Sequence, residues 1–192
     1  MLILCDTSSI IMLFPVVPDM FIDGKYDCIL IKEVHDELIQ TQKFKTRYPW
    51  IRTSRPKFRV RILSTEEKKA EETLFQAVNC LCEARVNKST GRMFDLSRED
   101  KKVISHTLAL GASVSTGDNN LSRFVKQEFP LDYKGDLSAL EVLVVWIQKG
   151  FIEWTREKQA FLLDWANNDE PVQPASAKRG FTALTGFDYV GT

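Results

Sequence analysis

Histidine and cysteine are both scarce in this sequence, with two histidines and four cysteines among 192 residues. The cysteines form no C-x-x-C pair, and neither histidine lies at zinc-finger spacing from a cysteine, which excludes the usual structural zinc sites. Two of the cysteines lie within apolar runs, so buried free thiols in a reducing cytoplasm are expected. The residues concerned are Cys5, Cys28, Cys80, Cys82, His35 and His106.

Two catalytic motifs are also missing. A serine hydrolase is excluded because the chain has no G-x-S-x-G and few histidines. His106 lies six positions after Asp100 on a predicted helix and so faces away from it, as a packed or surface histidine would. A glycine-rich phosphate loop is absent, so an NTPase is not indicated.

The chain lacks long apolar runs and a surplus of either charge. Its longest apolar stretches, such as Leu137–Ile147, are shorter than the roughly 20 residues of a membrane-spanning helix. No basic segment or small-residue cleavage site follows Met1, so we expect no signal peptide and a cytoplasmic protein without membrane contact. Lysine plus arginine equal aspartate plus glutamate at 26 each, so only the distribution of charge can indicate a polyanionic partner.

Short apolar runs alternate with amphipathic segments, which predicts an α/β fold: a parallel twisted sheet with helices on both faces. Ser64 with Glu67, and Ser97 with Asp100, have the spacing of helix-opening capping boxes. Strands are predicted at Leu2–Cys5, Cys28–Ile31 and Ala112–Thr116, with a weaker one at Arg59–Leu63. Helices are predicted at Ile10–Phe14, Glu33–Gln42, Ser64–Val86, Ser97–Gly111, Asn119–Val125, Asp136–Trp146 and Thr155–Asn167.

Four carboxylates fall at corresponding places beside the predicted strands. Asp6 directly follows the first strand, and Asp118 follows the third after one glycine. Glu37 lies on the helix after the second strand, and Asp100 lies in the first turn of a central helix. Because ligands of such sheets bind beyond the carboxyl ends of the strands, we expect the four side chains to converge there. Each acid also has a simpler interpretation. Asp6 could be only a helix cap and Glu37 a solvated residue, while Asp100 could be only the capping-box partner of Ser97 and Asp118 a turn residue.

Such a group of carboxylates predicts a divalent metal ion. Mg²⁺ and Mn²⁺ take oxygen ligands, and four clustered carboxylates would repel one another strongly without a cation. A metal ion can lower the pKa of a bound water molecule and hold a phosphodiester for in-line attack. We therefore expect Asp6, Glu37, Asp100 and Asp118 to bind Mg²⁺ or Mn²⁺.

Three segments carry these acids: L-I-L-C-D-T-S-S-I from Leu2, K-E-V-H-D-E-L from Lys32, and L-S-R-E-D-K-K-V-I-S-H-T-L-A-L-G-A-S-V-S-T-G-D-N-N-L from Leu96. Together they resemble the PIN-domain ribonucleases, which include the VapC class of toxins from toxin–antitoxin pairs. The resemblance covers most of residues 1–125. It implies a PIN-like nuclease domain at residues 1–150, followed by a C-terminal helix and tail at residues 151–192. It also implies Mg- or Mn-dependent endoribonuclease activity, with the four acids as catalytic and metal-binding residues.

Three polar side chains near the acids are expected to orient them. Ser8 and Thr116 each lie two residues from an acid, and hydroxyl groups commonly donate hydrogen bonds to carboxylates that bind metals. Asn120 stands where some relatives carry a further acid, which leaves both one ion and two ions open.

The stretch after the Glu37 helix is strongly basic. Eight lysines and arginines fall between positions 43 and 61, and no acid lies between Leu38 and Thr65. Because cations contact phosphates and aromatic rings stack on unpaired bases, we expect the stretch to bind RNA beside the acids. A solvated loop with locally packed aromatics is the alternative. The predicted RNA-binding residues are Lys43, Lys45, Arg47, Tyr48, Trp50, Arg52, Arg55 and Lys57.

Two other functions stay open. A HAD-like phosphatase would use Asp6 as its nucleophile and Asp118 on its metal, but Ser8 breaks the D-x-D motif of that family. A PIN-like domain without turnover would serve as an RNA-binding or scaffold module. Metal-dependent cleavage of RNA by the purified protein separates these functions.

The end of the chain combines a tail-like composition with large apolar side chains. The segment from Asp169 is rich in Pro, Ala, Ser, Gly and Thr, so we expect it to be mobile or ordered by a partner. Phe181–Tyr189 is too apolar for a solvated end, and aromatic residues are typical of interface cores. It is therefore expected to dock on the chain's own body, on a second copy in a homodimer, or on a partner such as an antitoxin. Truncation after Asn168 should then leave a folded protein with altered association.

Overall fold

The computed structural model describes residues 1–192 and contains one four-stranded sheet in which every neighbouring pair of strands is parallel. The strand order is β2-β1-β3-β4. The strands are β1 (Ile3–Cys5), β2 (Cys28–Ile29), β3 (Ser113–Ser115) and β4 (Asp136–Leu137). The predicted α/β class with a parallel sheet is therefore confirmed.

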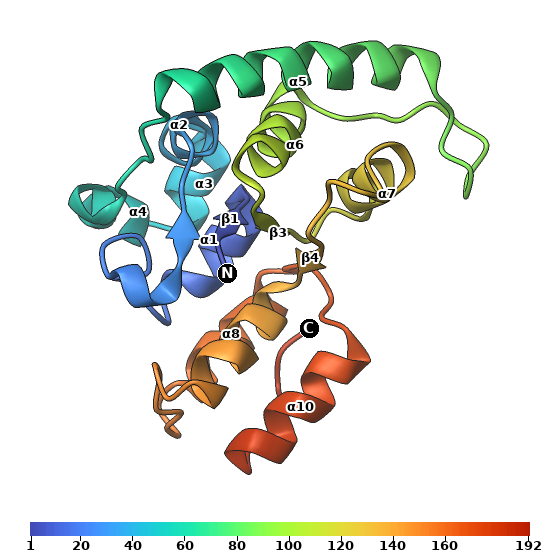
Figure 1. The fold of residues 1–192 in the computed structure, drawn as a ribbon. Coiled ribbons are helices and arrows are strands. Elements are labelled where there is room, and N and C mark those ends of the chain that lie inside the picture. Colours follow the sequence, from blue (N-terminus) through green and yellow to red (C-terminus); the bar gives the residue numbers. More distant parts are fainter.

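Ten α-helices and two short 3-10 helices surround this sheet. Figure 1 shows α5 and α6 above the strands and α8 and α10 below them, with the sheet between the two groups. The helices are α1 (Thr7–Leu13), η1 (Gly24–Tyr26), α2 (Lys32–Gln40), α3 (Gln42–Arg47), α4 (Trp50–Ser54), η2 (Arg55–Lys57), α5 (Thr65–Ala84), α6 (Arg98–Leu110), α7 (Asn119–Glu128), α8 (Ala139–Gln148), α9 (Gln159–Asn167) and α10 (Ala175–Thr185).

The two central strands, β1 and β3, bring distant parts of the chain together. Ile3 pairs with Ser113 and Cys5 pairs with Ser115, although the two strands lie in opposite halves of the sequence. The backbone N–H of Asp6 continues the pairing by donating to the carbonyl of Ser115 at 3.0 Å. The residues that follow β1 and β3 therefore emerge at the same edge of the sheet.

Local capping chemistry sets the starts of three helices beside this sheet. Ser64 with Glu67 and Ser97 with Asp100 form the predicted capping boxes, in which the serine hydroxyl accepts from the third backbone N–H. Gly111 ends α6 in the left-handed conformation, with φ of 57°. The third box, Ser138 with Glu141, corrects the prediction that Asp136 caps this helix. Asp136 instead lies in β4, a strand that the sequence did not predict.

Several further elements differ from the prediction. The helix after β2 ends at Gln40, and the basic stretch forms α3, α4 and η2 instead of a solvated loop. The weak strand predicted at Arg59–Leu63 is reduced to a single bridge, in which Val60 pairs with Leu30. The last predicted helix begins at Gln159, not Thr155.

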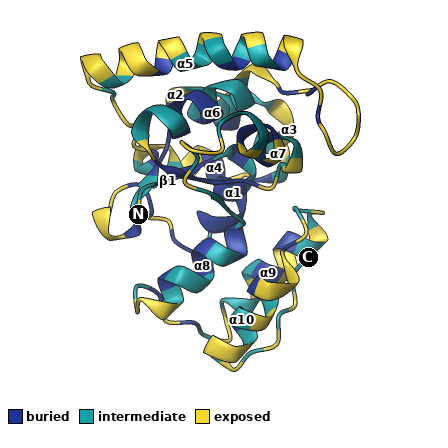
Figure 2. Cartoon of the chain, turned by 45° about the vertical axis from the view of Figure 1, so that its right-hand side comes forward, coloured by how far each residue is buried: buried dark blue, intermediate teal, exposed yellow.

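The tail that was predicted to be mobile or ordered by a partner is packed against the rest of the chain. Helix α10 lies against α8, and its Phe181 is fully buried. Phe181 also meets the ring of Trp154 edge-on, with centroids 5.0 Å apart. A single cluster of 42 buried hydrophobic residues runs from β1 to Phe181, so the core continues across residue 150 (Figure 2). The segment Phe181–Tyr189 thus docks on the chain's own body.

The cysteines are all free thiols, as predicted, but not all are buried. Cys5 and Cys82 are buried, Cys28 is half-buried and Cys80 is exposed. Cys80 lies on the outer side of α5, which explains its exposure, because α5 packs mainly against α6. No helix in the structure combines the length and apolar character that crossing a membrane requires.

Candidate active site

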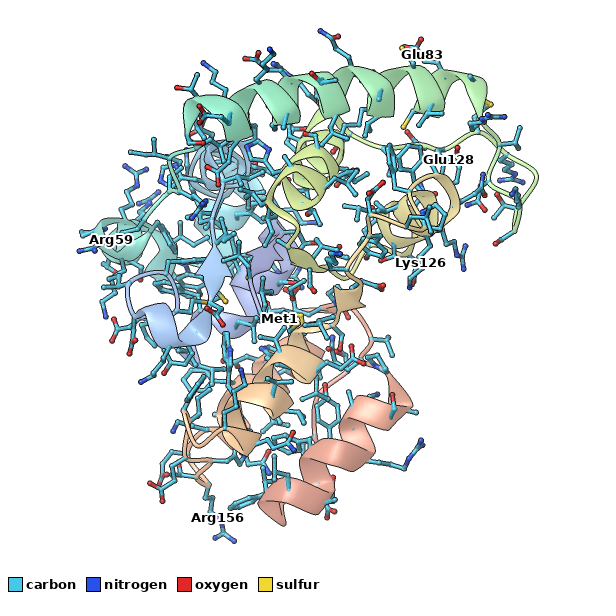
Figure 3. The ribbon with its side chains drawn as sticks, viewed as in Figure 1. Met1, Arg59, Glu83, Lys126, Glu128 and Arg156 are labelled. Carbon is cyan, nitrogen blue, oxygen red and sulfur yellow. The ribbon has the colours of Figure 1, made fainter.

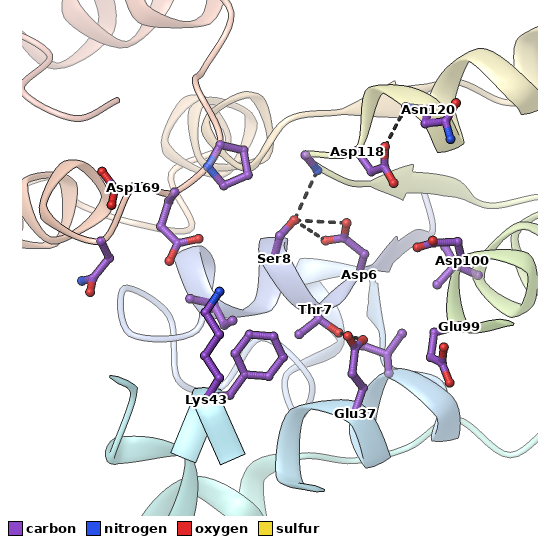
Figure 4. Close-up of a pocket in the computed structure, with 18 of the residues that line it drawn as sticks. Asp6, Thr7, Ser8, Glu37, Lys43, Glu99, Asp100, Asp118, Asn120 and Asp169 are labelled. Carbon is purple, nitrogen blue, oxygen red and sulfur yellow. Dashed lines mark hydrogen bonds between the residues drawn. The ribbon is translucent and has the colours of Figure 1, made fainter. Parts of the chain in front are cut away.

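All four predicted acids line one cavity of about 730 Å³ at the edge of the sheet where β1 and β3 end. Asp6 follows β1, Glu37 lies in the middle of α2, Asp100 lies in the first turn of α6, and Asp118 caps α7. Figure 4 shows the four carboxylates pointing into this space from four different elements. The convergence follows from the parallel sheet, because successive strands deliver their following residues to one edge.

Asp6 is the most heavily hydrogen-bonded of the four acids. It caps α1 by accepting from the N–H of Ser9 at 2.7 Å. The hydroxyl of Ser8 donates to both of its oxygens, at 2.9 and 3.1 Å, and that of Thr116 donates to Oδ2 at 2.6 Å. Burial raises the pKa of Asp6, and the hydrogen bonds from Thr116, Ser9 and Ser8 offset part of that rise.

The pKa of Glu37 is affected by the charges of neighbouring acids. Burial raises its pKa most, a hydrogen bond from the Thr7 hydroxyl lowers it, and repulsion by Glu99, Asp100 and Asp6 raises it again. Glu99, Asp100 and Asp6 are therefore close enough to disfavour the ionised form of Glu37. A bound cation would relieve this repulsion.

Asp100 and Asp118 each use one oxygen for a structural task and keep the other free. Asp100 Oδ2 accepts from the N–H and hydroxyl of Ser97, at 2.9 and 2.7 Å. Asp118 Oδ1 accepts from the N–H groups of Asn120 and Leu121, at 2.6 and 3.4 Å. Neither Asp100 Oδ1 nor Asp118 Oδ2 accepts a hydrogen bond, so each can serve a ligand. Asp100 is thus the capping-box partner of Ser97, as one interpretation of the sequence had it, and Asp118, interpreted there as a turn residue, caps α7. These roles account for only one oxygen of each side chain.

The donor set fits Mg²⁺ or Mn²⁺ in its chemistry, because it offers carboxylate and hydroxyl oxygens and no sulfur or imidazole. No three Asp, Glu, His or Cys side chains stand close enough together to form a ready-made metal cluster. The acids line one cavity without closing on a common point. A hydrated ion suits this spacing, because Mg²⁺ usually keeps several water ligands and takes only one or two carboxylates directly.

The three residues predicted to orient the acids lie beside them. Ser8 donates to Asp6, the acid two residues before it, as its spacing suggested. Thr116 also donates to Asp6 and not to the carboxylate of Asp118, the acid two residues after it. Thr116 reaches Asp118 as well, since its hydroxyl accepts from that residue's N–H at 2.9 Å. The side-chain amide of Asn120 donates to the carbonyl of Asp95 at 2.6 Å, so Asn120 supports the start of α7.

The basic stretch divides into two parts. Lys43, Arg47 and Tyr48 line the same cavity as the acids. Arg52 and Arg55 do not line it, and Lys57 pairs with Asp19 at 3.0 Å. Farther along the chain, Arg59 lies at the outer side of the molecule (Figure 3).

The aromatic side chains that were predicted to stack on RNA bases pack largely against the protein core. The Trp50 ring stacks on Phe14, with centroids 5.3 Å apart and planes 11° apart. Tyr48 is buried, and its hydroxyl donates to Glu170. Phe44 is half-buried against the core and also lines the cavity. Lys45 is half-buried and lies outside the cavity lining.

The sequence did not identify the wall of the cavity that faces the acids across it. Asn168, Asp169, Glu170 and Pro171 form this wall, at the end of α9. Arg47 Nε donates to Asn168 Oδ1 at 3.0 Å and ties the wall to α3. Glu99 and Arg123, from α6 and α7, line the cavity as well. Glu99 adjoins Asp100 in the motif, which is a usable signal, but no pattern links residues 168–171 to the acids.

Comparison of the chain with protein-family models, with curated proteins and with solved structures found no match.

Proposed function

We propose that this protein is a metal-dependent endoribonuclease of the PIN type, which cleaves phosphodiester bonds at the cavity lined by Asp6, Glu37, Asp100 and Asp118. The observation that carries the proposal is the convergence of these four acids, from four separate elements, on one cavity. The PIN-like sequence motifs support the same assignment. Asp6 would be the central ligand, because the hydroxyls of Ser8 and Thr116 and the backbone N–H of Ser9 all donate to its carboxylate and fix its orientation.

Mg²⁺ or Mn²⁺ would supply the chemistry of a bound water with lowered pKa and of charge neutralisation at the phosphate. Asp6, Asp100 and Asp118 would hold the ion through their oxygens, with Ser8 and Thr116 fixing the orientation of Asp6. Glu37, whose pKa is raised by burial and by its acidic neighbours, would accept the proton of the attacking water. Cleavage would leave a 5′-phosphate and a 3′-hydroxyl.

Two exposed cations at the cavity would receive the phosphates of RNA. Lys43 lines it from α3 and Arg123 lines it from α7. A chain with no net charge needs such a local concentration of cations to hold a polyanion near its carboxylates. Within the basic stretch, we therefore propose that RNA contacts the residues that line the cavity and not the rest.

Asp118→Asn tests the proposal directly. Asparagine caps helices as well as aspartate does, so the start of α7 should be kept while one charge is removed. We expect loss of most Mn²⁺-dependent cleavage of a labelled RNA, and loss of the rise in unfolding temperature that Mn²⁺ gives the wild type. Asp132→Asn, at an exposed position outside the cavity, is the matched control and should behave as the wild type does. Full activity of Asp118→Asn would contradict the assignment.

Membership of a toxin–antitoxin pair is a further part of this proposal. Expression of a nuclease toxin halts growth, so the wild type should arrest a host culture and Asp118→Asn should not. Protein that binds RNA but never cleaves it, with either metal, would instead favour an RNA-binding or scaffold module.

A further inference from the structure

Two residues other than glycine have a left-handed backbone, and both are aspartates: Asp27, with φ of 55°, and Asp169, with φ of 51°. Asp27 has a structural reason to be an aspartate. Its Oδ2 accepts from the N-terminal ammonium group of Met1 at 2.9 Å, which forms an ion pair. Asp169 has no such partner, because its carboxylate takes part in no hydrogen bond and no ion pair in the structure.

The position of Asp169 is one where glycine is expected. Its N–H donates to the carbonyl of Ala166 at 3.2 Å, and the N–H of Glu170 donates to that of Trp165 at 3.0 Å. These are the two bonds of a Schellman motif at the end of α9, whose left-handed residue is usually glycine. A carboxylate here also lies next to the negative end of the helix dipole. Backbone conformation and helix electrostatics both disfavour Asp169, so neither explains its presence.

The loop that holds Asp169 is fixed on both sides. The hydroxyl of Tyr48 donates to Glu170, and Pro171 packs against Gly117, where an added Cβ would lie 2.4 Å from the proline ring. Gln173, which is buried, donates to the carbonyl of Pro171 and accepts from the N–H of Leu140. The carboxylate of Asp169 is therefore presented on a rigid support.

Asp169 faces the space that a substrate would fill. It lines the cavity that holds the four acids, and Figure 4 shows its carboxylate directed inward, toward the side where Ser8 and Lys43 lie. An ionised carboxylate only accepts hydrogen bonds, and it repels phosphate. The group that meets Asp169 must then be a hydrogen-bond donor, and a polynucleotide offers donors on its sugar hydroxyls and base amino groups.

We infer that Asp169 is a specificity-determining residue, which accepts a hydrogen bond from a sugar hydroxyl or a base amino group of the nucleotide bound in the cavity. The inference rests on the proposed nuclease function and names the contact by which the site selects its nucleotide. It also gives the C-terminal segment a place in the site, because α9 and its end carry this residue.

The test compares binding by Asp169→Asn and Asp169→Gly with binding by the parent, all in the Asp118→Asn background with Mg²⁺, so that no strand is cut. Two pairs of labelled oligonucleotides are used. A ribo-oligonucleotide and its deoxy counterpart report a hydroxyl contact, and oligocytidine and oligouridine report contact with a base amino group. We expect both substitutions to reduce the preference in one pair by about tenfold, the usual effect of losing a hydrogen bond to a charged acceptor. The unfolding temperature of both variants should stay the same or rise, because strain and dipole repulsion are relieved.

Asp27→Gly is the matched control, since it changes the same residue type in the same backbone conformation away from the cavity. It should leave both preferences unchanged. Unchanged preferences in both Asp169 variants, or no binding of any oligonucleotide by the parent, would overturn the inference. A wild-type protein that binds these strands but does not cut them with Mg²⁺ or Mn²⁺ would disprove the nuclease proposal alone, and the binding preferences would still decide the role of Asp169.

Discussion

Thr116 links two of the acids through a single hydroxyl group. Its Oγ1 donates to Asp6 at 2.6 Å and accepts from the N–H of Asp118 at 2.9 Å, and the side chain is buried. A hydroxyl that donates to one acid and accepts from the backbone of another fixes their relative position. The hydroxyl of Ser8 donates to both oxygens of the same carboxylate.

We predict that Thr116→Ala and Ser8→Ala each weaken Mn²⁺ binding by roughly 10- to 100-fold, as loss of a residue that orients a metal ligand usually does. Calorimetric titration of the metal measures this directly. Ser89→Ala, in an exposed turn that does not line the cavity, is the control and should not change the affinity. If both cavity variants bind Mn²⁺ as the wild type does, the two hydroxyls do not orient a ligand.

Glu71 is a buried acid outside the cavity, between α5 and α6. It accepts from Lys102 Nζ at 2.9 Å and from the Ser105 hydroxyl at 2.7 Å. Burial raises its pKa, but the Ser105 and Lys102 hydrogen bonds and the His106 and Lys102 charges outweigh that effect, so the pKa is lowered from its usual 4.5. A lowered pKa means that the unfolded chain binds the proton more tightly than the folded one. This acid therefore contributes stability above pH 4.5 that is lost as the pH falls through its folded-state pKa.

We predict that Glu71→Gln costs about 1–3 kcal/mol at neutral pH, because it leaves Lys102 without its charged partner. Between pH 6 and pH 3, the loss of stability should be smaller in the variant than in the wild type. Urea denaturation at a series of pH values measures both effects. Parallel curves for the two proteins would show that Glu71 has the same pKa folded and unfolded.

The acids of the site could be predicted from the sequence, but Asp169 could not. Asp6 directly follows the first predicted strand, Asp118 follows the third after one glycine, and Asp100 lies at the third position after a serine cap, so local patterns give each residue a place at the sheet edge. Asp169 is brought to Ser8 only by the packing of α9 and the following loop. No local pattern contains that information.

The basic elements α3 and α4 are joined in sequence but separate in their relation to the cavity. Lys43 and Arg47 lie on α3 and line it, whereas Arg52 on α4 does not. Equal charges on neighbouring helices therefore have different expected roles. The sequence showed that the stretch is basic, but only the structure shows which of its cations line the cavity and which do not.

We predict that Lys43→Glu with Arg123→Glu weakens RNA binding and flattens its dependence on salt, because fewer counterions are released. The double variant Arg52→Glu with Arg55→Glu changes the net charge by the same amount and should have a smaller effect on both. Titration of a labelled RNA at several salt concentrations gives the slopes. Equal slopes for the two double variants would show that general charge, and not the cavity, governs binding.

Elements were predicted best where chemistry acts over a few neighbouring residues. The capping boxes at Ser64 and Ser97 and the glycine end of α6 are such cases. Strand β4 was missed because it has two residues, Asp136 and Leu137, and no apolar run marks it. Its pairing with β3 depends on tertiary structure alone.

At the scale of the whole molecule, the C-terminal segment belongs to the core. Trp165 Nε1 donates to the carbonyl of Met12 at 3.0 Å, and Gln173 and Phe181 are buried against α8 and its surroundings. Small and polar residues made the tail look mobile, because composition does not show that the few large side chains will be covered. Truncation after Asn168 is therefore expected to destabilise the protein, contrary to the prediction made from the sequence.

We predict that Phe181→Ala lowers the free energy of unfolding by about 3–5 kcal/mol, the usual cost of removing a buried phenylalanine side chain. Leu184→Ala, on the same helix but 43% exposed, should change it by no more than about 0.5 kcal/mol. Denaturant unfolding of the two variants makes the comparison. Equal stability would mean that α10 is not held by its buried face.

The pairing of β1 with β3 has a consequence for how the protein is made. Ribosomes release a chain from its N-terminus at roughly 5–20 residues per second, so β1 can pair early with β2 but meets β3 only after the far half of the sequence has begun to emerge. The wall at Asn168–Pro171 emerges later still, after Asp6, Glu37, Asp100 and Asp118. A growing chain therefore has no closed cavity until residues 168–171 have emerged. If the protein is the ribonuclease that we propose, this order of assembly would spare the messenger RNA from which the protein is being made.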